Sequence, residues 1–90
     1  EGETDKARGY LQRALAVDGK LARTHFFLAM VEKADGNYDA ALEALRKVEQ
    51  QYPRDRVMLN QLGRIQFLKR DYGAAVKTLE RVLEIDTEDV

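Results

Sequence analysis

Apolar residues recur through almost the whole chain at the spacing of three and four residues that places them on one side of a helix. Three stripes have nearly the same pattern: Ala7, Leu11, Ala14 and Leu15; Ala41, Leu45 and Val48; Ala75, Leu79, Val82 and Leu83. Two intervening segments have shorter stripes, formed by Leu28, Val31 and Ala34 and by Leu62, Ile65 and Leu68. No stretch shows the sustained alternation of a strand. The pattern predicts an all-α chain of five helices over residues 4–17, 21–35, 38–51, 56–70 and 72–85.

Residues that stop a helix separate these segments. Gly36-Asn37 tolerates a positive φ angle, so a helix can end and the chain can reverse there. Pro53 lacks an amide hydrogen and clashes with a continuing helix, so the third helix ends before it, and Asp18-Gly19 ends the first. Arg70-Asp71 contains no glycine, so we expect ordinary residues to make this turn and Asp71 to cap the next helix. Connections this short predict antiparallel neighbours.

The sequence also repeats itself at an offset of 34 residues without a gap. The turn Gly36-Asn37-Tyr38 is matched by Arg70-Asp71-Tyr72. Further equivalent positions are Ala7, Ala41 and Ala75; Leu11, Leu45 and Leu79; Ala14, Val48 and Val82; Arg13, Lys47 and Arg81; Leu28 and Leu62; Ala29 and Gly63; Val31 and Ile65. A fixed period of this length is typical of stacked copies of one small unit. We therefore expect a partial unit over residues 1–20 and complete units over residues 21–54 and 55–90.

Composition narrows the classes of function. The chain has 90 residues, with 15 Lys and Arg against 16 Asp and Glu, so its formal net charge is −1. This balance provides no bulk attraction to nucleic acid or to an anionic membrane, and no apolar run has the length of a membrane span. The sequence contains no cysteine or serine, and His25 is its single histidine. We recognise no metal set, nucleophile–base pair or phosphate loop, and we expect neither an enzyme nor a bound cofactor.

The repeat resembles the tetratricopeptide repeat, whose 34-residue signature is W-x2-L-G-x2-Y, then A-x3-F, then P. In the middle unit the signature positions hold His25, Leu28, Ala29, Glu32, Ala41, Leu45 and Pro53. In the last unit they hold Leu59, Leu62, Gly63, Gln66, Ala75, Leu79 and Thr87. The small residues that allow two helices to approach closely are kept. Glu32 and Gln66 replace the large apolar residue usual at the eleventh position of the family's repeat, where the signature W-x2-L-G-x2-Y has its tyrosine. His25 replaces the large residue usual at the fourth, and Thr87 replaces the proline.

The resemblance implies a right-handed α-solenoid of antiparallel helix pairs, in which the first helix of each pair lines a concave face that holds a peptide or a partner helix. The residues at the positions of that face are Arg23, Phe26, Met30 and Lys33 in the middle unit and Val57, Asn60, Arg64 and Phe67 in the last. We expect a non-catalytic protein-interaction module that binds another protein or a peptide. Its predicted contact residues are Arg23, Phe26, Met30, Asn60, Arg64 and Phe67.

Two alternatives remain open from the sequence. In the first, Phe26, Met30 and Phe67 fill the packing between repeats, and the chain is a structural scaffold segment. In the second, the chain self-associates through its ends. The resemblance makes the first helix the second member of a pair and leaves the last helix without a following repeat. We therefore expect Val76, Leu83 and Ile85 to be partly exposed, which would favour a homo-oligomer.

Overall fold

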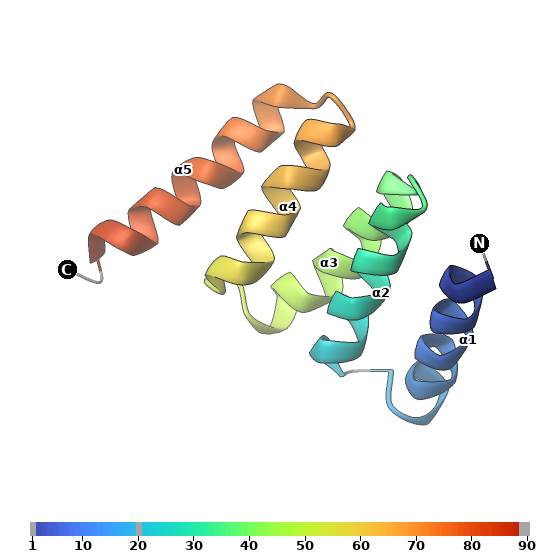
Figure 1. Ribbon diagram of the computed structural model, residues 1–90. Coiled ribbons are helices and arrows are strands. Elements are labelled where there is room, and N and C mark those ends of the chain that lie inside the picture. The colour runs from blue at the N-terminus through green and yellow to red at the C-terminus, as the bar shows by residue number, and fades with distance from the viewer. Residues whose placement is uncertain (1, 20, 89–90) are drawn as a thin grey trace.

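The computed structural model describes residues 2–19 and 21–88, which form five helices (Figure 1). In chain order they are α1 (Gly2–Val17), α2 (Ala22–Ala34), α3 (Tyr38–Gln51), α4 (Arg56–Leu68) and α5 (Tyr72–Glu88). The predicted all-α chain is confirmed, and both ends of α3 agree with the predicted bounds. The other helices differ from prediction by one to three residues at an end. The predicted unit boundaries at residues 1, 20 and 90 lie outside the described residues.

Each helix packs mainly on the helices that precede and follow it. Close packing joins α1 to α2, α2 to α3, α3 to α4 and α4 to α5. Figure 1 shows the helices in chain order across the molecule, with the two termini at opposite ends. The molecule extends over 40 × 27 × 16 Å. Helices that contact chiefly their sequence neighbours form an α-solenoid, so the predicted stack of helical hairpins is confirmed in place of a bundle around one centre.

The turns inside the two complete repeats have the same hydrogen bonds, although only one turn contains glycine. After α2, the Gly36 amide donates to the Lys33 carbonyl (3.0 Å) and the next amide donates to the Glu32 carbonyl (2.8 Å). After α4, the Arg70 amide donates to the Phe67 carbonyl, and the next amide to the carbonyl one residue earlier, each at 2.9 Å. This is the Schellman motif, which places one residue in the left-handed region. Gly36 has φ 80° and Arg70 has φ 70°.

Aspartate side chains cap the two helices of the last repeat. The Asp55 carboxylate accepts a hydrogen bond from the Met58 amide (2.9 Å), and α4 begins directly after Asp55. Asp71 accepts one from the Ala74 amide (3.3 Å), as predicted for the start of α5. Each cap satisfies an amide that has no partner within the helix. The caps therefore determine which residues of each helix occupy its first turn.

The core lies where α3 packs against both α2 and α4. Its largest fully buried side chains are Leu45, Met58, Leu59 and Ile65. The small residues at equivalent positions of α2 and α4, Ala29 and Gly63, are also buried. A Cβ added to Gly63 would lie 3.5 Å from side-chain atoms of both Leu79 and Thr78. A short side chain at this position therefore allows α4 and α5 to approach within van der Waals contact.

One prediction about exposure is wrong. Ile85 is only 7% exposed and belongs to the main hydrophobic cluster. Val76 and Leu83 are 55% and 64% exposed, as predicted. The three residues lie on the same helix, but Ile85 packs into the cluster that includes α4, whereas Val76 and Leu83 lie on a side of α5 that no described helix covers.

Glu32, the charged residue that replaces the tyrosine of the repeat signature in the middle repeat, has an ion-pair partner in α1. The Arg8 guanidinium donates to Glu32 Oε1 through Nη2 (2.8 Å) and Nε (3.2 Å) and also pairs with Asp35 and Asp5. The Glu32 side chain is 14% exposed, so an unpaired carboxylate there would be unfavourable. Hydrogen bonds from Arg8 to Glu32, and then to Asp35, raise the pKa of Arg8 above its ordinary value. The cluster joins α1 to the carboxyl end of α2.

Gln66 and His25, two further polar departures from the repeat signature, are also paired. Thr78 Oγ1 on α5 lies 2.6 Å from Gln66 Oε1 on α4 and donates to it or to the Ala74 carbonyl (3.0 Å). His25 is 7% exposed, and its Nε2 lies 2.7 Å from the carbonyl oxygen of Gly19, to which a protonated Nε2 donates. Buried polar groups in proteins normally have such partners. Among the described residues, no buried side-chain nitrogen or oxygen lacks one.

Candidate functional site

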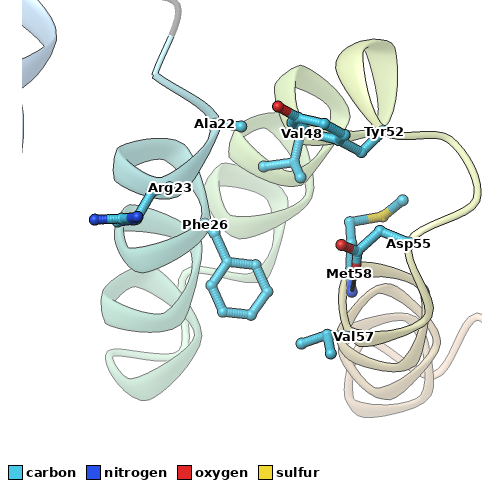
Figure 2. A pocket seen from close by; sticks show the side chains of 8 residues that line it. All are labelled: Ala22, Arg23, Phe26, Val48, Tyr52, Asp55, Val57 and Met58. Atoms are coloured by element: carbon cyan, nitrogen blue, oxygen red, sulfur yellow. Dashed lines mark hydrogen bonds between the residues drawn. The ribbon is translucent and has the colours of Figure 1, made fainter.

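A cavity of about 230 Å³ opens at the junction of the two complete repeats (Figure 2). Residues of α2, the carboxyl end of α3 and the amino end of α4 form its walls. They are Ala22, Arg23, Phe26, Val48, Tyr52, Asp55, Val57 and Met58. Figure 2 shows the Phe26 ring and the Val57 and Met58 side chains on opposite sides of this space. Most of the wall is apolar, and charged groups lie at Arg23 and Asp55.

Local structure determines which side chains reach the cavity. Ala22 and Phe26 are four residues apart in α2, so they lie on the same side of that helix. The Asp55 cap starts α4 and thereby places Val57 and Met58 in its first turn. Tyr52 follows α3 directly, where its amide donates to the Val48 carbonyl (2.8 Å). Each wall residue is therefore held at a helix end or in a helical turn.

The two charged groups of the cavity have different surroundings. The Asp55 carboxylate already accepts the hydrogen bond from the Met58 amide. The Arg23 side chain is exposed and has no ion-pair partner among the described residues. A second hollow, of about 610 Å³, adjoins the cavity and shares Ala22, Arg23 and Tyr52 with it. Arg23 therefore stands between an apolar cavity and open surface, where it could meet an acidic group.

The structure divides the six predicted contact residues into three groups. Arg23 and Phe26 line the junction cavity, together with Val57 from the same predicted face. Asn60, Arg64 and Phe67 line a separate hollow of about 570 Å³ with Gly63, Ala75 and Leu79. Met30 lines neither space and is half-buried against the core.

Lys33, also from the predicted face, lines neither space; its ammonium donates to Gln61 Oε1 (3.0 Å) and joins α2 to α4.

Sequence reasoning missed five of the eight wall residues: Ala22, Val48, Tyr52, Asp55 and Met58. Val48 was recognised only as part of a core stripe, and it is indeed 5% exposed, yet it also forms part of the cavity wall. Tyr52 immediately precedes Pro53 in the loop between repeats and is 56% exposed. A large aromatic residue directly before a helix-ending proline was the available signal, because it must lie at the repeat junction.

Other kinds of site find no support in the described part of the chain. Within residues 2–19 and 21–88, no three His, Cys, Asp or Glu side chains are grouped in a way that could hold a metal ion. None of the helices described there combines the length and the apolar character needed to cross a bilayer.

Comparison with known proteins gives a consistent result. Residues 20–88 match the family described as tetratricopeptide repeat. A crystal structure of MamA protein has a TM-score of 0.88 at 28% identity, with 96% of this chain and 47% of that chain covered. MamA from residue 41 to the end, from Desulfovibrio magneticus RS-1, has a TM-score of 0.90 at 21% identity, with 96% and 49% covered. The chain thus spans about half the length of these solved chains. No similar sequence was found among the curated proteins.

Proposed function

The chain belongs to the tetratricopeptide-repeat family, and on that premise we propose that it binds an extended peptide of a partner protein at the junction cavity between α2 and α4. The family consists of protein-interaction and scaffold modules, and the chain is one of these. The finer assignment concerns where the peptide lies and which side chains hold it. Phe26 and Val57 receive an apolar side chain of the peptide, and Arg23 receives a neighbouring acidic group.

The single observation that carries this proposal is the convergence of Phe26 and Val57 on one cavity. They come from the first helices of successive repeats, α2 and α4, and both line the same space with Met58. A volume of about 230 Å³ exceeds the roughly 150 Å³ of an engineered apolar cavity that binds benzene. The space is therefore large enough for one apolar side chain, and its apolar walls would gain from being covered.

The charged groups of the cavity favour a peptide with an acidic residue next to its apolar one. Arg23 lies at the edge of the cavity without an ion-pair partner among the described residues, whereas Asp55 is engaged as a helix cap. A guanidinium group forms two parallel hydrogen bonds with a carboxylate. A peptide with Asp or Glu next to a bulky apolar residue satisfies both parts of the site.

The rigidity of the site lowers the cost of binding. Its residues are held in helical turns and by the Asp55 cap, so few side chains must be ordered when a peptide arrives. The remaining predicted contact residues, Asn60, Arg64 and Phe67, line the other hollow. We do not assign them to this peptide.

A peptide selection tests the proposal. Random twelve-residue peptides displayed on phage are selected against the immobilised chain, and enriched peptides are measured by fluorescence anisotropy. We expect enrichment of a bulky apolar residue next to Asp or Glu. The variants Arg23→Glu and Val57→Glu should each weaken binding at least about tenfold, because a charged hydrogen bond or a buried apolar contact contributes more than about 1.4 kcal/mol.

Folding and surface controls keep this test specific. Val57 is 63% exposed, so Val57→Glu should retain the helical circular dichroism of the parent chain. Val17→Glu introduces the same charge at an exposed valine of α1, outside the cavity. Equal binding by all three variants, or no enrichment over a blank surface, would refute the proposal and favour a scaffold segment without a ligand at this cavity.

A further inference from the structure

The amino end of α2 opens onto the hollow of about 610 Å³ that adjoins the junction cavity, and we call this space the α2 hollow. The residues that line it include no acidic one: Leu21, Ala22, Arg23, Thr24, Gln51 and Tyr52. The first turn of α2 contains no acidic residue either. The first amides of a helix have no acceptor within the helix, and together they carry a positive charge of about half a unit. The α2 hollow therefore faces hydrogen-bond donors and no negative group of its own.

The equivalent place in the last repeat shows what such amides accept. Leu21 and Asp55 occupy equivalent positions directly before α2 and α4, with nearly the same backbone angles (φ −70°, ψ 106° and φ −74°, ψ 117°). At α4, the Asp55 carboxylate accepts a hydrogen bond from the Met58 amide (2.9 Å). At α2, a leucine stands in this place and no side chain caps the helix. The amide of Thr24, which is equivalent to Met58, therefore lacks the negatively charged acceptor that the Met58 amide has.

A buried hydroxyl group at the same place is a second, independent indication of a ligand. Thr24 is only 7% exposed and lines the α2 hollow, yet its Oγ1 has no hydrogen-bond partner in the described part of the chain. No fully enclosed side-chain oxygen in that part lacks a partner. The Thr24 oxygen therefore reaches open space, and the α2 hollow is the space that Thr24 lines. The other buried threonine, Thr78, has oxygen partners within the protein. A ligand with acceptor atoms would satisfy Thr24 in the same way.

The charge and the number of donors favour a phosphoryl group over a carboxylate. Arg23 lines the hollow, and its guanidinium has no ion-pair partner among the described residues. Together with the amino end of the helix it provides a positive charge of about 1.5. A phosphoryl group carries a charge of about −1.5 to −2 at neutral pH and has three strong acceptor oxygens, whereas a carboxylate has a single charge and two oxygens. The amides of the first turn, the Thr24 hydroxyl and the guanidinium can donate to three oxygens, and helix amino ends commonly bind phosphate.

We propose that the α2 hollow binds a phosphoryl group carried by the partner peptide, next to the apolar residue that enters the junction cavity. The inference rests on the peptide site proposed above and specifies its acidic residue as a phosphorylated serine or threonine. Ala22, Arg23 and Tyr52 line both spaces, so neighbouring residues of one extended peptide can occupy them together. Phosphorylation of the partner thereby controls its binding to this chain.

Matched peptides test this proposal. A peptide enriched in the phage selection is synthesised in three versions, with glutamate, serine or phosphoserine at its acidic position, and binding is measured by fluorescence anisotropy. We expect the phosphoserine version to bind at least about tenfold more tightly than the glutamate version, because it adds an acceptor oxygen and further negative charge. Arg23→Gln and Thr24→Val should each reduce this advantage, because each removes a donor to the phosphoryl group.

A variant that supplies the missing cap from within the chain gives the sharpest control. Leu21→Asp provides α2 with the cap that Asp55 gives to α4, and it puts a negative charge where the phosphoryl group binds. We expect this variant to lose the advantage of the phosphoserine version and to have a higher melting temperature. Tyr10→Asp adds the same charge at an exposed residue of α1 and should leave the advantage unchanged. Circular dichroism should show helical structure in every variant.

Inorganic phosphate probes the α2 hollow without any peptide. In NMR titrations of the ¹⁵N-labelled chain, phosphate should shift the amides of the first turn of α2 saturably, and Leu21→Asp should abolish these changes. The proposal is overturned if chloride at the same ionic strength produces the same shifts, if the glutamate version binds as tightly as the phosphoserine version, or if Leu21→Asp keeps the advantage. The last two results leave the proposed peptide site standing. Phosphate-specific shifts without binding of any peptide version would instead refute the peptide site, since the hollow would then bind free phosphate.

Discussion

Arg70 holds a left-handed backbone conformation that its equivalent, Gly36, adopts without a Cβ. Both residues occupy the same place in a Schellman motif, and the hydrogen bonds of the two motifs agree. A side chain in this region is disfavoured by roughly 1–2 kcal/mol. The turn between α4 and α5 therefore contains a strained backbone at Arg70. The packing of these two helices offsets that strain.

Arg70→Gly should stabilise the protein. It removes the Cβ strain, and the greater freedom of glycine in the unfolded chain offsets part of that gain, which leaves about 0.5–1 kcal/mol. Thermal unfolding followed by circular dichroism should show a melting temperature a few degrees higher. Gly36→Ala is the matched control and should lower the free energy of unfolding by about 1 kcal/mol. A neutral or destabilising Arg70→Gly would mean that the arginine side chain is needed in the folded state.

At the scale of the helix, the attachment of α1 differs from that of α3 and α5. No described residue of α1 is fully buried. Its contact with α2 includes the charged cluster of Arg8 with Glu32 and Asp35. Leu42 and Val76 occupy the positions equivalent to Arg8. The same place in the repeat therefore carries a cation in α1 and an aliphatic residue in the two later helices.

Replacing one partner of this cluster should loosen α1. Arg8→Met leaves the nearly buried Glu32 carboxylate without its cation, so we expect a lower melting temperature. Adding Glu32→Leu to the same chain should restore it, because a well-packed apolar pair can replace an ion pair. Asp5→Asn is the control, since Asp5 is 75% exposed and its pair with Arg8 contributes little. A double variant no more stable than Arg8→Met would show that the unpaired Glu32 carboxylate is not the cause of the lower melting temperature.

For the whole molecule, a stacked array predicts that stability decreases toward its ends. Each helix is stabilised mainly by its sequence neighbours. Helix α3 has two such neighbours and contributes five buried residues, whereas α1 has one neighbour and contributes none. A molecule of this shape has no single centre whose loss would unfold every helix at once.

Hydrogen exchange should reveal this gradient directly. We expect the amides of α1 to exchange fastest, those of α3 and α4 slowest, and those of α5 at intermediate rates, because opening of an end helix exposes least apolar area. NMR-detected exchange on the 90-residue chain measures these rates. Equal protection of α1 and α3 would contradict the prediction and indicate one cooperative unit.

The helices, most turns and the repeat could be predicted from the sequence, because they follow from periodicity and from the backbone preferences of nearby residues such as Gly36, Pro53 and Asp71. Which side chains share a surface could not be predicted, because exposure depends on the helices packed alongside, and the fold alone places them. It placed Phe26 and Val57 in one cavity, assigned Phe67 to another hollow and buried Ile85. It also paired Glu32 with Arg8, 24 residues away, which no local pattern encodes.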